Sequence, residues 1–229
     1  MARMYGADYF EERPETEWTQ QMRDWYDPIA RQIYLENRDR DRLDPLYMRG
    51  GGWDQYPWGQ GIRFPEPPAP LKLKVTKLPG NILPDILYGS VAVSARVMTK
   101  IEKIEPNVHQ FIPLEIELPD GTISDRPYWR FCDMNVLDTL VLEKSEQVQP
   151  IWPNKERFPD FFRYGETANG PPVLALNKAV IAGKAIWQDY KLSLNFFSDD
   201  LANWLDAEGI KGWESDGSFG SRRATIIEV

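Results

Sequence analysis

The chain has 229 residues, of which 42% are hydrophobic and 27% charged, a composition typical of a globular protein and not of a disordered one. Its net charge of −8 argues against a nucleic-acid partner, because basic side chains must neutralise the phosphates of such a partner. The one cysteine, Cys132, excludes an internal disulfide and a cysteine-rich zinc site, and it fits a reducing compartment. The first residues carry charges throughout, and no stretch reaches the ~18 apolar residues of a spanning helix. We therefore expect a cytoplasmic protein without a membrane partner.

The N-terminal part of the chain differs in composition from the rest, because residues 1–70 contain no lysine and are rich in tryptophan and tyrosine. Apolar residues at helical spacing over positions 18–29 predict a helix, and the pair Asp27-Pro28 predicts its start. Prolines dominate residues 65–70 and favour an extended, stiff backbone. We therefore place a boundary at residue 70 and predict that residues 1–70 form an N-terminal helical, aromatic-rich appendage.

After this boundary, alternating apolar residues predict β-strands. The longest run covers residues 108–118 and is followed by a turn of the sequence Pro-Asp-Gly. Further strands are predicted at residues 71–76, 90–94, 128–133, 136–142, 173–176, 185–187 and 192–197. Ser94 and Ser198 are each placed to cap a helix, and the apolar side of the second helix contains Leu201, Trp204 and Leu205. This mixture predicts an α+β fold with a mixed, largely antiparallel sheet and a few packed helices over residues 71–217, followed by a C-terminal tail over residues 218–229.

Few side chains in the sequence can perform common enzyme chemistry. A serine or cysteine nucleophile paired with histidine would need His109, the only histidine, as its base. Cys132 is a conceivable nucleophile, but it falls in a predicted strand, and we expect a buried structural thiol. One histidine also excludes a metal site built from several imidazoles, and no phosphate-binding or dinucleotide-binding glycine motif occurs. We predict no catalytic residue, no cofactor and no metal site, while paired carboxylates among the 35 acidic residues leave hydrolysis open.

Several short segments between residues 71 and 216 occur in an order and at a spacing typical of one family. They are Leu83-Pro84-Asp85-Ile86-Leu87, Val91-Ala92-Val93-Ser94, Val108-His109-Gln110-Phe111-Ile112-Pro113-Leu114, Tyr128-Trp129-Arg130-Phe131, Asn135-Val136-Leu137-Asp138, Glu143-Lys144-Ser145, Phe196-Phe197-Ser198-Asp199-Asp200-Leu201 and Glu208-Gly209-Ile210-Lys211-Gly212-Trp213. In these segments the chain resembles the bacterial polymorphic-toxin immunity domain of the Myxococcus xanthus type. The stretch Ala185-Ile186-Trp187-Gln188 departs from the aromatic-arginine strand usual in that family, and residues 1–70 lie outside the resemblance.

The resemblance implies a non-enzymatic immunity protein, encoded beside a toxin, that neutralises this toxin by stoichiometric occlusion. The implied partner is the cognate toxin, and a basic, nuclease-type effector would complement the acidic charge of the chain. Solubility is a simpler explanation of the same charge. Two other functions stay open: a carboxylate-dependent hydrolase of unknown substrate, and a scaffold or interaction module without a toxin.

Aromatic and acidic side chains in loops and at helix ends are the predicted contacts with the toxin. Tryptophan and tyrosine dominate many interface hot spots, and the first predicted group lies in a glycine-flanked loop: Trp53, Asp54, Tyr56 and Trp58. The second group lies on the helix after Ser198: Asp199, Asp200, Asp206 and Glu208. The third lies in a run of alternating charge: Asp39, Asp41 and Asp44. Each group has a structural alternative: anchoring of residues 1–70 on the sheet, helix capping and simple solvation, respectively.

Overall fold

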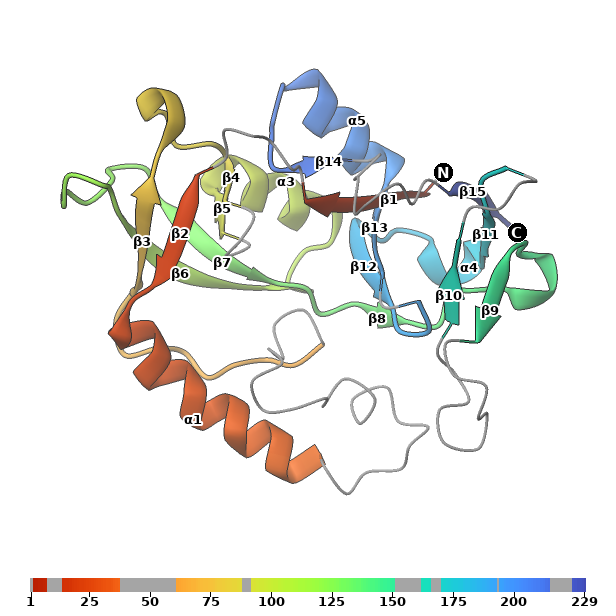
Figure 1. Ribbon diagram of the computed structural model, residues 1–229, viewed down its shortest axis with the longest axis horizontal. Coiled ribbons are helices and arrows are strands. Elements are labelled where there is room, and N and C mark those ends of the chain that lie inside the picture. Colours follow the sequence, from red (N-terminus) through yellow and green to blue (C-terminus); the bar gives the residue numbers. More distant parts are fainter. Residues whose placement is uncertain are drawn as a thin grey trace.

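The computed structural model describes residues 2–7, 14–37, 61–87, 92–150, 162–165, 170–192, 194–214 and 224–229 of the chain. The described strands form a six-stranded sheet, a five-stranded sheet and two two-stranded sheets, which follow one another along the long axis of the molecule (Figure 1). Most strand pairings are antiparallel. The fold is therefore α+β with largely antiparallel sheets, as the sequence predicts.

The six-stranded sheet forms the left part of the molecule in Figure 1. Its strands, in spatial order, are β2 (Glu15–Trp18), β3 (Leu71–Lys77), β6 (Gln110–Glu117), β7 (Tyr128–Cys132), β5 (Ala92–Ser94) and β4 (Ile86–Leu87). The predicted alternation is confirmed in β3, where Leu71, Leu73 and Val75 are buried and the residues between them are more exposed. The predicted turn after β6 is also present, since the amide of Gly121 donates to the carbonyl of Leu118 at 2.9 Å.

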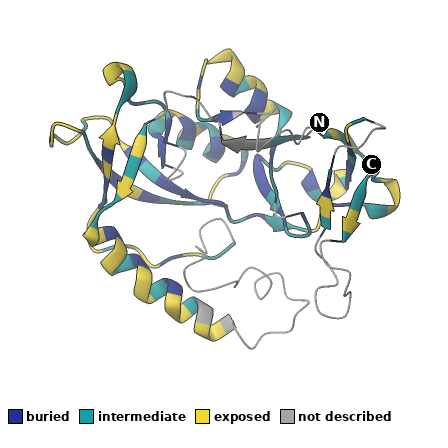
Figure 2. Cartoon of the chain, viewed as in Figure 1, coloured by how far each residue is buried: buried dark blue, intermediate teal, exposed yellow. Residues whose placement is uncertain are grey.

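Helix α1 (Gln20–Asn37) packs against one face of this sheet. Met22, Tyr26 and Ala30 are buried against β3 and its neighbours, whereas the outer side of the helix is exposed (Figure 2). The sequence predicts a helix start at Asp27-Pro28, but the helix begins eight residues earlier. The hydroxyl of Thr19 accepts a hydrogen bond from the Met22 amide at 3.4 Å and marks this earlier start. Pro28 is exposed inside the helix, where water can satisfy the carbonyl that loses its partner.

The five-stranded sheet lies next to the six-stranded one. Its order is β14 (Trp213–Glu214), β1 (Ala2–Ala7), β13 (Leu194–Ser198), β12 (Ile186–Asp189) and β8 (Val136–Leu137). The N-terminal strand β1 therefore lies between two strands from the other end of the chain, with Ala2 opposite Ser198 and Ala7 opposite Trp213. The described parts of residues 1–70 thus contribute to both large sheets.

Strand β8 is shorter than the strand predicted over residues 136–142. Beyond it, the buried carboxylate of Asp189 accepts hydrogen bonds from the Thr139 amide at 2.8 Å, the Thr139 hydroxyl at 2.7 Å and the Leu140 amide at 3.0 Å. Because these amides bind a side chain, they are not available to a β-ladder, and the strand ends.

Two helices share a hydrophobic core with both large sheets. They are α3 (Ala95–Ile104) and α5 (Asp199–Ala207), and their buried residues pack with Phe131 from β7 and with Ile186 and Phe197 from β12 and β13. Ser198 caps α5 as predicted. Ser94 precedes α3 but does not cap it through its side chain, because its hydroxyl donates to the Asp85 carboxylate at 2.6 Å instead.

The remaining elements form the right part of Figure 1 around a third core that contains Trp187 and Phe196, stacked at 5.8 Å. They are the 3-10 helix η3 (Leu142–Lys144), the strands β9 (Val148–Pro150), β10 (Phe162–Tyr164), β11 (Val173–Leu176) and β15 (Thr225–Glu228), and the short helix α4 (Lys178–Ile181). A second 3-10 helix, η1 (Pro79–Asn81), follows β3 in the left part. Strand β15, near the C-terminus, pairs in parallel with β11. This strand lies within the segment that the sequence predicts to be a tail.

Candidate partner-binding surface

Helix α5 presents one of the predicted acidic groups on its exposed side. The Ser198 hydroxyl accepts from the Leu201 amide at 3.3 Å and fixes the start of the helix, and Gly209, at a positive φ of 62°, follows its end. Leu201 and Leu205 are buried against the sheets. The side chains of Asp200 and Asp206 are accordingly 68% and 70% exposed.

Each of the four predicted acids, three on α5 and Glu208 directly after its end, is paired with a cation of the same chain. The Arg3 guanidinium binds Asp199 at 2.9 Å and Asp206 at 3.2 Å. Lys100 binds Asp200 at 3.0 Å, and Arg96 binds Glu208. Burial alone would raise the pKa of Asp199, but its contacts with cations, Arg3 among them, hold that pKa below its ordinary value.

These ion pairs lie at the surface, where such pairs contribute about 0–1 kcal/mol each because water and salt screen them. A basic partner could therefore replace Arg3, Lys100 and Arg96 at little cost. These acids are thus at least partly exposed, and the four carboxylates share three cations of the chain, because Arg3 pairs with both Asp199 and Asp206.

An aromatic side chain that sequence reasoning placed in the core adds to this surface. Trp204 is only half-buried, and both Arg96 and Lys100 lie 5.9 Å from its ring centre. Five side chains from α3, from α5 and from its C-terminal end therefore lie together here: Arg96, Lys100, Asp200, Trp204 and Glu208. The sequence shows that Arg96 and Lys100, four residues apart, share one side of α3. Their position over Trp204 depends on the packing of α3 beside α5, for which the sequence carries no signal.

The other two predicted groups lie outside the described residues. They are the aromatic loop with Trp53, Asp54, Tyr56 and Trp58, and the charged run with Asp39, Asp41 and Asp44. The structure therefore does not place them relative to α5.

The conceivable nucleophile Cys132 and the only histidine are both buried. Burial raises the pKa of the Cys132 thiol to about 12, so the reactive thiolate is scarce at neutral pH. The two nitrogens of His109 contact the carboxylates of Glu105 at 3.1 Å and Asp133 at 3.3 Å. Because Cys132 is buried and both nitrogens of His109 contact carboxylates, the structure supports the expectation that Cys132 is a structural thiol.

The residues that the structure describes lack two further functional features. No group of three or more histidine, cysteine, aspartate or glutamate side chains in them is arranged to hold a metal ion. None of their helices is long and apolar enough to cross a membrane.

Comparison with known protein families gives a match. A family model described as "Immunity protein family (Imm11)" matches residues 8–216 of the 229. A search of curated proteins found no match.

Proposed function

Because the chain belongs to the Imm11 immunity protein family, we propose that it protects the cell that makes it by binding a cognate toxin in the cytoplasm and blocking this toxin in a stoichiometric complex. The family match over residues 8–216 is the observation that carries this proposal. The neutralisation we propose is binding and not catalysis. The carboxylates nearest to His109 are buried, so they give no support to a carboxylate-dependent hydrolase.

We propose the exposed side of α5 as one part of the toxin-binding surface. The acids of this helix, Asp199, Asp200 and Asp206, and Glu208 directly after its end would exchange their own cations for basic side chains of the toxin. Trp204 would add apolar contact area, since tryptophan is enriched in interface hot spots worth about 2 kcal/mol or more. The loop with Trp53, Asp54, Tyr56 and Trp58 stays a second proposed contact.

Co-expression tests the function. The toxin gene expected beside this gene is induced in a bacterial host with and without this chain, and growth is recorded. We expect growth arrest with the toxin alone and full growth with both. Growth arrest in both cultures, with both proteins present in soluble form, would contradict the proposal. If the chain is a scaffold without a toxin, induction of the neighbouring gene alone should not slow growth.

The interface is tested by charge removal and by salt. The variant Asp200→Asn with Glu208→Gln should slow association with a basic toxin, and the matched control Glu115→Gln, an exposed acid on β6, should not. Higher ionic strength should slow the association of the unmodified protein, because it screens attraction between charges. An association rate that is unchanged in both experiments would remove the α5 surface from the proposal.

A further inference from the structure

One buried cluster of charged groups has no part in the proposed toxin-binding surface. It contains Glu105 at the end of α3, His109 just before β6, and Asp133 just after β7. Their side chains are 3%, 0% and 5% exposed. Buried charges are costly unless they are paired, so the arrangement of this cluster needs a physical reason.

The Glu105 carboxylate accepts from an unusual number of donors. Its Oε2 accepts from the backbone amide of Ala185 at 2.5 Å, and its Oε1 accepts from the side-chain amide of Asn135 at 2.9 Å. His109 Nε2 lies 3.1 Å from Oε2, and the Lys184 ammonium lies 3.5 Å from Oε1. A carboxylate from the α3 side of the molecule therefore binds the chain where β12 of the five-stranded sheet begins.

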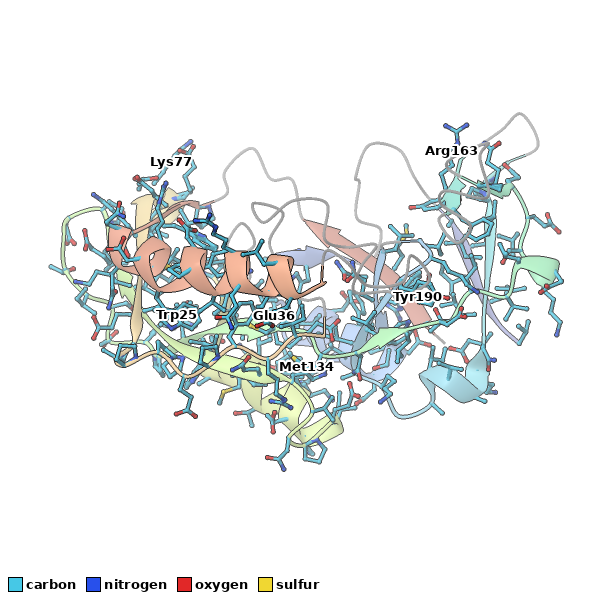
Figure 3. The ribbon with its side chains drawn as sticks, turned by 90° about the horizontal axis from the view of Figure 1, so that it is seen from below. Trp25, Glu36, Lys77, Met134, Arg163 and Tyr190 are labelled. Carbon is cyan, nitrogen blue, oxygen red and sulfur yellow. The ribbon has the colours of Figure 1, made fainter. Side chains whose placement is uncertain are left out.

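The link between the two sheets passes through the same place. Residues 133–135 connect β7 of the six-stranded sheet to β8 of the five-stranded sheet, and Met134, which lies among them, is labelled near the middle of Figure 3. Asn135 donates from its side chain to the Ile186 carbonyl at 2.8 Å, and its own carbonyl accepts from the Gln188 amide at 2.8 Å. The cluster thus joins elements of both large sheets.

The position of the histidine proton decides how the cluster is charged. His109 Nδ1 lies 3.3 Å from Asp133 Oδ1 and also 3.3 Å from the Met134 amide nitrogen. A neutral ring could accept from Met134, but its lone pair would then face the Asp133 oxygen. A doubly protonated ring instead donates to one carboxylate on each side, which accounts for both short contacts between nitrogen and oxygen but takes the acceptor at Nδ1 away from the Met134 amide.

We propose that His109 is a doubly protonated imidazolium at neutral pH, and that this charge, held between Glu105 and Asp133, is the joint that fastens the six-stranded sheet to the five-stranded sheet. Loss of this proton leaves two carboxylates at the joint, and among the residues that the structure describes the partly exposed ammonium of Lys184 still faces Glu105. The fold is therefore sensitive to alkaline pH.

The pKa values of His109 and Glu105 agree in direction with this geometry, whereas the raised pKa of Asp133 does not. Burial alone would lower the pKa of His109, but hydrogen bonds and attraction to Asp133 and Glu105 raise it from 6.5 to about 9. Burial alone would raise the pKa of Glu105, but its contacts with His109, Ala185 and Asn135 lower it from 4.5 to about 2. Burial raises the pKa of Asp133, and His109 opposes this rise.

The sign of the pH dependence follows from the raised His109 pKa. The stabilisation is complete below pH 6.5 and is lost as the pH rises through 9. Between pH 6.5 and 8.5, the unfolding equilibrium constant should rise roughly 40-fold from this one group. The Glu105 contribution behaves in the opposite way, because it is present above pH 4.5 and is lost as the pH falls through 2.

NMR of the imidazole ring tests the protonation state without any substitution. His109 is the only histidine, so its ring signals need no assignment among competitors. We expect nitrogen shifts of a doubly protonated ring at pH 7 and a titration midpoint near 9. In Glu105→Gln the midpoint should move down toward 6.5. A neutral ring at pH 7, with the proton on Asp133, would overturn the proposal, as would a midpoint at or below 6.5.

Urea unfolding at several pH values tests the joint itself. The unmodified protein should lose stability between pH 6.5 and 8.5, whereas His109→Gln should start less stable and show a flatter profile, because the group that titrates is gone. Cys132→Ala is the matched control, since it is buried nearby but should keep the pH profile of the unmodified protein. Parallel profiles for the unmodified protein and His109→Gln would overturn the proposal. If His109→Gln does not fold, the NMR titration midpoint of the unmodified protein still decides whether His109 is charged at neutral pH.

Discussion

Replacing Tyr26 with alanine is expected to destabilise the whole chain and not only helix α1. The Tyr26 side chain is 2% exposed and packs edge-on against Trp18, with ring centres 5.1 Å apart, and beside Phe64 at 5.8 Å. These residues belong to the same core as Leu73 and Ile116, which lie in the middle of the six-stranded sheet. Removal of a buried aromatic side chain costs about 3–5 kcal/mol, a large part of the 5–15 kcal/mol typical of a folded domain.

Urea denaturation followed by circular dichroism and by tryptophan fluorescence measures this effect. If α1 is an integral part of the sheet, both probes should report one transition, and its midpoint should fall by at least ~1 M urea. The matched control Arg31→Ala, on the exposed side of the same helix, should change stability by less than about 0.5 kcal/mol. Two separate transitions in Tyr26→Ala, with the second at the wild-type midpoint, would refute this reasoning and indicate a detachable appendage.

Three further substitutions or treatments test local features. Gly212→Ala should destabilise the protein by at least ~2 kcal/mol, because a Cβ atom at this φ of 115° would lie 2.6 Å from the Ile86 carbonyl oxygen; Gly80→Ala, which has open space around it, is the milder control. Thermal unfolding compares the two. Ser198→Ala should cost about 0.5–2 kcal/mol in urea unfolding, because α5 loses its N-cap. Cys132 should not react with a thiol reagent at pH 8 until the protein unfolds, since its pKa is raised to about 12; rapid labelling of the folded protein would contradict this.

The local elements could be predicted from the sequence because their signals are local. The apolar alternation of β6 and the cap at Ser198 depend on residues a few positions apart, and both are present in the structure. Pairings between distant segments carry no such signal. The position of β1 between β13 and β14, and that of β15 beside β11, depend on how the whole chain packs.

The same distinction applies to the candidate surface. The sequence predicts that Asp199 and Asp200 lie in the first turn of an exposed helix, as they do. It does not indicate that Arg3, 196 residues away from Asp199, would pair with it, or that Lys100 would pair with Asp200. The boundary at residue 70 stays a prediction, although β1 and β2 pair with strands that lie beyond it.

A titration of the purified toxin with this chain tests the central claim most directly. The activity of the toxin on its own target is measured after addition of increasing amounts of the chain. Neutralisation by binding predicts that activity falls in proportion to the amount added and reaches zero near an equimolar ratio. Full inactivation by a small fraction of an equivalent, increasing with time, would contradict the account, because it would mean that the chain acts on the toxin as a catalyst.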